Sequence, residues 1–191
     1  MYHLLGYLKS TRDRGIVLKC RGTTLQFAVD ASYNVHHNHR SHSGLHVTMG
    51  GSCEPDPGCG GPIVVKSHVQ RLVAASSCEA EIIAVMQYSH YFMLMRSLMM
   101  DFGFDQQEPS LILQDNEACV MILNQCKTEQ SSTRHMGMRI ARISELISDR
   151  VIQLVQCPTA SMPADPPSKP LHSGQDESKL RTLCNFDETT V

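Results

Sequence analysis

The sequence predicts one α/β domain built around a mixed sheet, and three observations point to it. The chain has 191 residues, which is the length of one domain with short tails. Its hydrophobic residues make up 41% of the chain and its charged residues 19%, too apolar for a disordered chain and too polar for a membrane protein. The candidate elements follow the order strand-strand-strand-helix-strand-helix-helix-strand, which is typical of an α/β domain with a mixed sheet.

The composition excludes several classes of protein. Seventeen Lys and Arg residues stand against nineteen Asp and Glu residues, so a formal net charge of -2 gives no basic excess for binding polyphosphates through bulk electrostatics. No apolar run of about 18 residues exists, so we expect no membrane span. Charged residues interrupt the first apolar patch, MYHLLGYLKSTRDRG, which is unlike a secretory signal. We therefore expect an intracellular protein that is not secreted.

The eight cysteines are scattered singly along the chain, and several of them lie in apolar periodic runs. We therefore expect reduced thiols that pack as small hydrophobic side chains, rather than a disulfide framework. Cys53 and Cys59 share one loop, but the lack of a CxxC pair makes a zinc site there the weaker interpretation.

The first half of the chain reads as three strands after an N-terminal segment. Residues 4–19 have helical and then extended spacing, with Gly15 between the two. Residues 25–32 alternate apolar and small side chains and therefore predict a strand. Residues 44–51 form a plausible hairpin partner, and residues 63–69 are a third strand candidate.

The second half alternates helical and extended patterns. Residues 76–102 have the 3.6-residue period of a helix. Residues 110–116 predict a short apolar strand with an acidic residue, Asp115, near its end. Helices are then predicted over residues 117–126 and 135–149, and a final strand over residues 151–157.

Two acids each follow an apolar strand, Asp30 in FAVDAS and Asp115 in LILQDN. If these strands are neighbours, both carboxylates lie at one edge of the sheet, where they repel each other unless a cation lies between them. Glu79 or Glu81 opens the long helix, and Asp165 follows the last strand. Carboxylates that converge from different elements suit two Mg²⁺ ions.

A simpler interpretation competes with a metal site. An acid at the end of a strand often forms a turn, and an acid in the first turn of a helix complements the helix dipole. Spacing alone therefore leaves both interpretations open, and the residues around the acids have to decide.

Those surrounding residues form eight short motifs: YLKSTRDRGI, FAVDAS, RSHSG, GGPIVVKS, SSCEAEIIAV, LQDNEA, STRHMGMRIARISE and PADPPSKPL. Their order and spacing resemble the ribonuclease H segment of Ty1/copia-type retrotransposon polyproteins. The resemblance covers about residues 4–171. It implies a ribonuclease H-like mixed five-stranded sheet flanked by helices.

The resemblance also implies a function, the two-metal hydrolysis of the RNA strand of RNA–DNA hybrids by an endonuclease. The family's Asp-Glu-Asp-Asp set matches Asp30, Glu81, Asp115 and Asp165, which would hold two Mg²⁺ ions, with Mn²⁺ able to replace them. We choose Glu81 over Glu79 because Ala84 follows it three positions on, as in related ribonucleases H. The two glutamates point about 200° apart on a helix, so only one of them can face the metals.

The implied partners are the RNA–DNA hybrid and the reverse transcriptase portion of the same polyprotein, with no membrane involved. Residues 1–22 resemble the end of that polymerase, residues 23–171 the ribonuclease H-like domain, and residues 172–191 a loosely ordered tail. The expected location is a cytoplasmic virus-like particle or the nucleus.

The sequence departs from the family pattern after Asp165, where Pro166 and Pro167 replace the start of a helix. Asp165 could cap a short helix with its carboxylate pointing inward, or the two prolines could push it out of the site. A catalytically decayed relic with weak nucleic-acid binding is therefore the main alternative function, ahead of an unrelated α/β binding module.

Histidines offer two further alternatives. His36, His37, His39 and His42 share one loop, but no second cluster at ligand spacing accompanies them, so a metal site there is the weaker interpretation. His135 fits the start of a helix or a core position better than a proton shuttle.

Overall fold

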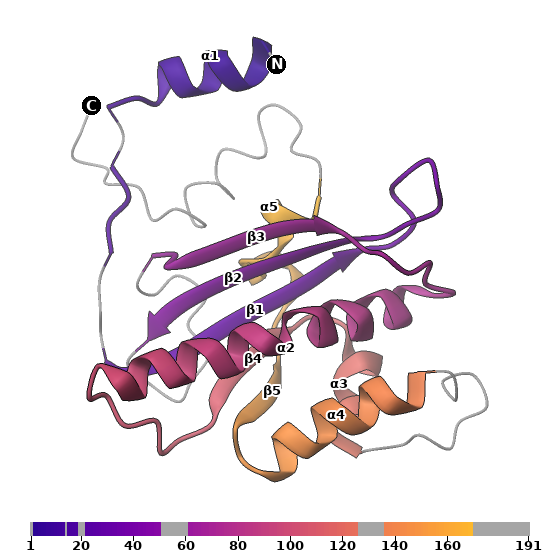
Figure 1. Ribbon diagram of the computed structural model, residues 1–191. Helices are drawn as coiled ribbons and strands as arrows, with labels where there is room; N and C mark the ends of the chain where they lie inside the picture. Colours follow the sequence, from indigo (N-terminus) through magenta and orange to yellow (C-terminus); the bar gives the residue numbers. More distant parts are fainter. Residues whose placement is uncertain (1, 14, 19–21, 51–60, 126–135, 170–191) are drawn as a thin grey trace.

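The computed structural model describes residues 2–13, 15–18, 22–50, 61–125 and 136–169. Its centre is one five-stranded sheet with the order β3-β2-β1-β4-β5 (Figure 1). The strands are β1 (Thr24–Ser32), β2 (His42–Gly50), β3 (Val64–Val69), β4 (Ser110–Gln114) and β5 (Ile152–Gln156). β1, β2 and β3 pair antiparallel, whereas β4 runs parallel to both β1 and β5. The predicted mixed five-stranded sheet is confirmed.

The helices form a layer on each face of this sheet (Figure 1). α2 (Ser77–Asp101), α3 (Glu117–Gln125) and α4 (Gly137–Ser148) cover one face, and the short α5 (Asp165–Ser168) lies on the other. α1 (Tyr2–Ser10) lies apart from both layers, and a single 3₁₀ turn (Thr159–Ser161) precedes α5.

The alternation of β1 decides which residues face which layer, because successive side chains of a strand point to opposite faces. Leu25, Phe27 and Val29 belong to the main core beneath α2, α3 and α4. Ala28 points the other way and packs in a smaller cluster that includes Ala164, the residue before α5. Asp30 follows Ala28 two residues later, near the end of β1.

The predicted elements agree with the observed ones to within a few residues, with two differences. The helix in the N-terminal segment spans Tyr2–Ser10, so the helical part of that segment begins earlier than predicted. The strand predicted over residues 110–116 ends at Gln114, so Asp115 and Asn116 lie in the turn that follows it.

Three of the earlier predictions fall outside the described residues: the loop with Cys53 and Cys59, His135, and the tail from residue 172. Within the described ranges Cys78, Cys119 and Cys157 are free thiols. None of the helices in these ranges is long and apolar enough to cross a membrane.

Candidate metal centre

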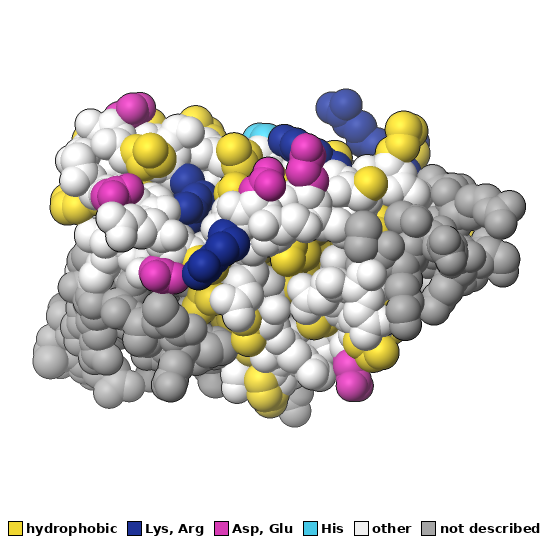
Figure 2. Space-filling model, turned by 90° about the horizontal axis from the view of Figure 1, so that it is seen from below, with side chains coloured by type: hydrophobic (Ala, Val, Ile, Leu, Met, Phe, Trp, Pro, Cys, Tyr) yellow, Lys and Arg dark blue, Asp and Glu magenta, His cyan; other side chains and the backbone are white. Residues whose placement is uncertain are grey.

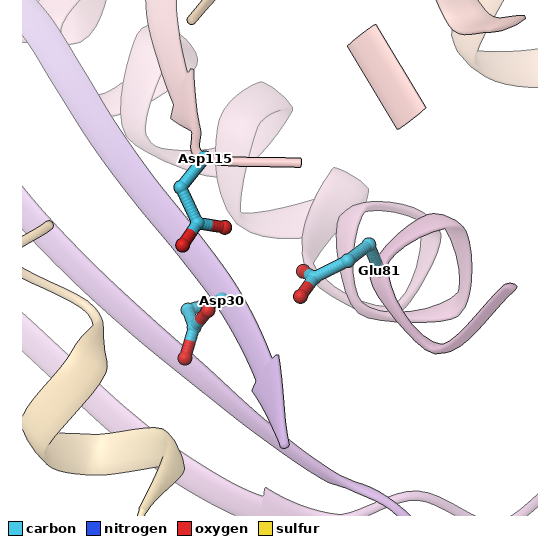
Figure 3. A group of neighbouring side chains, drawn as sticks. All are labelled: Asp30, Glu81 and Asp115. Atoms are coloured by element: carbon cyan, nitrogen blue, oxygen red, sulfur yellow. The ribbon is translucent and has the colours of Figure 1, made fainter. Parts of the chain in front are cut away.

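Three carboxylates meet at one edge of the sheet: Asp30 near the end of β1, Asp115 just after β4, and Glu81 in the first turns of α2 (Figure 3). One oxygen atom from each of them lies within 4.8 Å of the other two. The parallel register explains the pairing of the aspartates, because Ala28 of β1 lies opposite Leu113 of β4 and each aspartate follows two residues later.

The start of α2 decides which glutamate joins the two aspartates. Ser76 is the N-cap, and its side chain accepts a hydrogen bond from the backbone N–H of Glu79 at 3.1 Å. The Glu79 carboxylate in turn accepts a hydrogen bond from the backbone N–H of Ala75 at 2.9 Å. Glu79 therefore stabilises the helix start, while Glu81 is 4% exposed and faces the aspartates.

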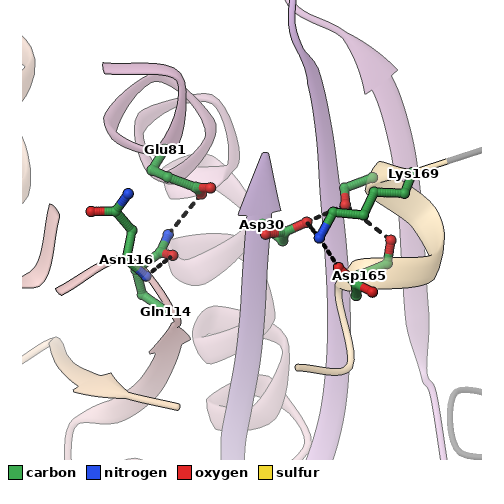
Figure 4. Close-up of polar contacts among 7 residues, drawn as sticks. Asp30, Glu81, Gln114, Asn116, Asp165 and Lys169 are labelled. Atoms are coloured by element: carbon green, nitrogen blue, oxygen red, sulfur yellow. Dashed lines mark hydrogen bonds and ion pairs between the residues drawn. The ribbon is translucent and has the colours of Figure 1, made fainter. Parts of the chain in front are cut away.

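Gln114, the last residue of β4, orients Glu81. Its side-chain amide donates a hydrogen bond to Oε2 of Glu81 at 3.0 Å, and its own Oε1 accepts one from the backbone N–H of Asn116 at 3.1 Å (Figure 4). The side chain of Asn116 accepts a hydrogen bond from the backbone N–H of Cys119 at 3.0 Å, near the start of α3. Gln114 was not among the predicted site residues, although a polar residue at the end of an apolar strand is a signal for such a role.

The buried position of the carboxylates changes their protonation. Burial raises the pKa of Asp30 to about 6, and the nearby charges of Asp115 and Asp165 add to this effect. The Glu81 carboxyl has a pKa well above its usual value, first because it is buried and then because Asp30 lies beside it. Close, buried carboxylates of this kind are costly to ionise together unless a cation is bound between them.

The fourth predicted acid, Asp165, is buried and reaches the same region from the other face of the sheet. Nζ of Lys169 forms an ion pair with Oδ1 of Asp165 and also lies 3.8 Å from Oδ2 of Asp30 (Figure 4). The hydroxyl of Ser168 donates a hydrogen bond to Oδ2 of Asp30. Asp165 is thus connected to Asp30 through Lys169, but it does not belong to the group of three.

The two prolines do not turn Asp165 out to the solvent. α5 begins at Asp165 with prolines in its first turn, where a missing N–H costs little, and Ala164 rather than Asp165 is the N-cap. Asp165 is therefore buried, as in the first of the two arrangements that the sequence left open, but it does not cap the helix.

Gly44 allows α5 to lie this close to the sheet. It is the register partner of Asp30 across β1 and β2. A Cβ atom at this position would lie 2.6 Å from the backbone oxygen of Ala164 and 2.8 Å from the backbone nitrogen of Ser168. Gly44 belongs to the RSHSG motif, which did not by itself predict this close approach.

The donor set fits a hard divalent cation, because such ions prefer carboxylate oxygens and the acidic charges here are incompletely offset. Among the described residues, Asp30, Glu81 and Asp115 form the one group of three or more potential ligands. The loop histidines are not part of it: Nε2 of His36 and Nδ1 of His42 lie 3.0 Å apart and interact with each other.

Similarity to known proteins agrees with this geometry. No protein-family model matches the chain. Over 106 residues, 56% of the chain, it is 26% identical to the retrovirus-related Pol polyprotein from transposon TNT 1-94 of Nicotiana tabacum. The match spans only 8% of the length of that polyprotein.

Solved structures show the same fold. LC11-RNase H1, isolated from compost, superposes with a TM-score of 0.54 at 13% identity, over 76% of this chain and 92% of the other. The structure of LC11-RNase H1 in complex with an RNA/DNA hybrid gives a TM-score of 0.51 at 14% identity, over 74% and 91% of the two chains. The foamy viral protease-reverse transcriptase, solved in complex with dsDNA, gives 0.51 at 17% identity, over 87% and 95%.

The sequence match and the shared fold together confirm the predicted resemblance: this chain has a ribonuclease H fold and resembles the ribonuclease H domain of a retrotransposon polyprotein.

Proposed function

We propose that this chain is a metal-dependent ribonuclease H that hydrolyses the RNA strand of RNA–DNA hybrids by endonucleolytic cleavage. The observation that carries the proposal is the convergence of Asp30, Glu81 and Asp115 within 4.8 Å, at the ends of two parallel strands of a ribonuclease H fold. Hydrolysis of a phosphodiester needs an activated water and a stabilised leaving oxygen. A carboxylate cluster provides both when it holds divalent cations.

Asp30, Glu81, Asp115 and Asp165 would hold two Mg²⁺ ions, with Mn²⁺ able to take their place. When bound, such ions lower the pKa of the attacking water and stabilise the departing 3′ oxygen. The cost of ionising buried carboxylates side by side supports this assignment, since each bound cation offsets that cost.

The side chains around the carboxylates have a positioning role. Gln114 fixes one oxygen of Glu81, and Ser168 fixes one oxygen of Asp30. Lys169 offsets part of the charge of Asp30 and Asp165 and ties the end of α5 to β1. Oriented ligands of this kind bind a cation without rearrangement, and this favours catalysis.

An RNA–DNA hybrid is the proposed substrate. LC11-RNase H1, which shares the fold, has been solved in complex with such a hybrid. A hybrid differs from duplex DNA in its 2′-hydroxyls and its shallow minor groove, and these allow recognition by shape.

Part of the affinity for the substrate would come from other segments of a longer polyprotein. On the face seen in Figure 2, acidic and basic side chains are interspersed, and the net charge of the chain is -2. We expect weak binding by this chain alone, with a reverse transcriptase portion as its partner and residues 1–22 as the end of that portion. Such a polyprotein would act inside the cell, in a virus-like particle or the nucleus.

A non-catalytic relic of the same fold is the second candidate. The ion pair between Lys169 and Asp165 favours it, because an ammonium group lies where the fourth carboxylate would meet a cation. A relic would keep the fold and at most weak nucleic-acid binding.

Cleavage of an RNA–DNA hybrid labelled on its RNA strand, in Mg²⁺ or Mn²⁺, tests the proposal. Metal-dependent cutting that is lost in Asp115→Asn supports the ribonuclease. A folded chain that cuts in neither metal contradicts it and favours the relic, and so does cutting that persists unchanged in Asp115→Asn.

A further inference from the structure

A hollow of about 440 Å³ lies beside the carboxylates, between the loop that joins β1 to β2, strand β3 and α5. Five polar residues line it: His36, His42, Ser67, Ser168 and Lys169. Val35 and the two prolines of α5 form apolar parts of its wall.

Lys169 connects the hollow to the candidate metal centre. Lys169 lines the hollow, and its ammonium group pairs with Asp165 and lies 3.8 Å from Oδ2 of Asp30. If a polymer binds with its reacting unit at the carboxylates, the next unit along the polymer would therefore lie at the hollow.

The histidines of the hollow are held in place by one another and by β3. Nδ1 of His42 lies 3.0 Å from Nε2 of His36, and Nε2 of His42 lies 2.7 Å from the hydroxyl of Ser67. These contacts fix the rings before any ligand binds, and a site that is already ordered loses less entropy on binding.

The chemistry of the lining suits an anion. The Lys169 ammonium, the second ring nitrogen of His36 and the Ser67 hydroxyl can donate hydrogen bonds to anionic oxygens, whereas both ring nitrogens of His42 are engaged by His36 and Ser67. No carboxylate is among the residues that line the hollow. The apolar wall suits the sugar that accompanies a backbone phosphate. The neighbouring acids Asp30, Glu81 and Asp115 would repel such a phosphate, so a separate anion site is what a nucleic-acid substrate needs there.

We propose that the hollow lined by His36, His42, Ser67 and Lys169 binds a backbone phosphate of the nucleic acid, next to the phosphodiester at Asp30, Glu81 and Asp115. The inference rests on the proposed function for the identity of the polymer. A contact of this kind fixes the position of the duplex and does not read its sequence.

The test measures binding without cleavage, by fluorescence anisotropy of a labelled hybrid and of a DNA duplex of the same sequence. The protein is the full chain carrying Asp115→Asn, in about 0.15 M salt, where charges more than about 8 Å apart are largely screened. Val35→Glu adds a negative charge to the hollow, and His37→Glu adds the same charge to an exposed position of the same loop outside it.

We expect Val35→Glu to raise the Kd about fivefold to tenfold, and His37→Glu to change it less than twofold. The pair His36→Ala and His37→Ala repeats the comparison without adding charge, and circular dichroism checks that each variant is folded. Weaker binding of both duplexes supports a contact with a phosphate of either strand. Weaker binding of the hybrid alone supports a contact with a phosphate of the RNA strand.

Equal affinities in Val35→Glu, His36→Ala and the Asp115→Asn parent would overturn the inference, as would a parent that binds neither duplex. The unsubstituted chain separates this failure from failure of the proposed function. If it cleaves the hybrid while the hollow variants bind normally, only the hollow is wrong. If it binds through the hollow but never cleaves, only the ribonuclease is wrong.

Discussion

The ammonium of Lys169 lies 3.8 Å from the carboxylate of Asp30, although the two residues are separated by most of the folded chain. The same ammonium pairs with Asp165, so one side chain offsets charge on two buried acids. Without a bound metal, Lys169 is therefore a resident counter-ion of the site.

Replacing Lys169 with Met should destabilise the metal-free protein, because it leaves Asp30 and Asp165 without that counter-ion. Lys169 is partly exposed, so we expect a loss of about 1–2 kcal/mol rather than the larger cost of breaking a fully buried pair. Urea unfolding at pH 7 in a chelator measures it, with Lys169→Arg as the charge-preserving control. Mg²⁺ should recover more stability in Lys169→Met than in the parent, and equal stabilities without metal would contradict the counter-ion role.

Gly44→Ala should move α5 away from the sheet, since the added Cβ would meet the backbone of Ala164 and Ser168 at less than 3 Å. Overpacking of this kind costs about 1–3 kcal/mol. Hybrid cleavage should fall as well, because Asp165 moves with α5. Gly137→Ala is the matched control, as a Cβ there meets no atom within 4 Å. Cleavage and stability equal to those of the parent would show that α5 does not need this close approach.

Gln114→Ala should weaken metal binding, because Glu81 loses a hydrogen bond that favours its charged form. Loss of one oriented partner of a metal ligand typically costs about 10–100-fold in metal affinity or activity. The measurement is the Mg²⁺ concentration that gives half-maximal cleavage, compared with Gln107→Ala at an exposed site. If the two variants require the same Mg²⁺ concentration, Gln114 does not orient Glu81 for the metal.

The stability of the metal-free protein should fall between about pH 4 and pH 6. The pKa of Asp30 is about 6 in the folded chain and 3.8 as its ordinary value, so the folded state holds this proton more tightly. Its contribution to stability is complete below pH 4 and is lost as the pH rises through 6, to a total of about 3 kcal/mol at most.

Urea unfolding at pH 4, 5, 6 and 7 in a chelator measures this loss, and Asp30→Asn isolates it from the contributions of other groups. The slope of the free energy of unfolding against pH is compared between the parent and Asp30→Asn, and the difference gives the contribution of Asp30. Identical slopes would mean that Asp30 titrates in the folded chain as it does in the unfolded one.

The sequence predicts the strands well because β1 and β4 are mostly apolar and bounded by polar residues. The selection of Glu81 over Glu79 came from a resemblance, and the structure adds a local reason, since Ser76 caps α2 and engages Glu79 instead. Asp30 and Asp115 were expected to meet if their strands were neighbours, and the parallel register makes them neighbours.

Spacing could not predict the contacts of α5. Gly44, Ser168 and Lys169 meet only because a four-residue helix packs on the second face of the sheet, more than a hundred residues after β2. The prolines in that helix left the direction of Asp165 open in the sequence, since their effect depends on where the chain enters the helix. Tertiary packing settles this point, and local propensity does not.

The topology also bears on how the chain folds. β1, β2 and β3 are joined through neighbouring segments, whereas β1 pairs with β4 only after α2, and β5 pairs after α4. Pairings between distant segments form more slowly, because a long loop must close before the contact stabilises it. We therefore expect the antiparallel half to form first. The edge of the sheet where Asp30, Glu81, Asp115 and Asp165 come together is then among the last parts of the fold to form. Repulsion between these acids therefore opposes the final steps of folding and not the first.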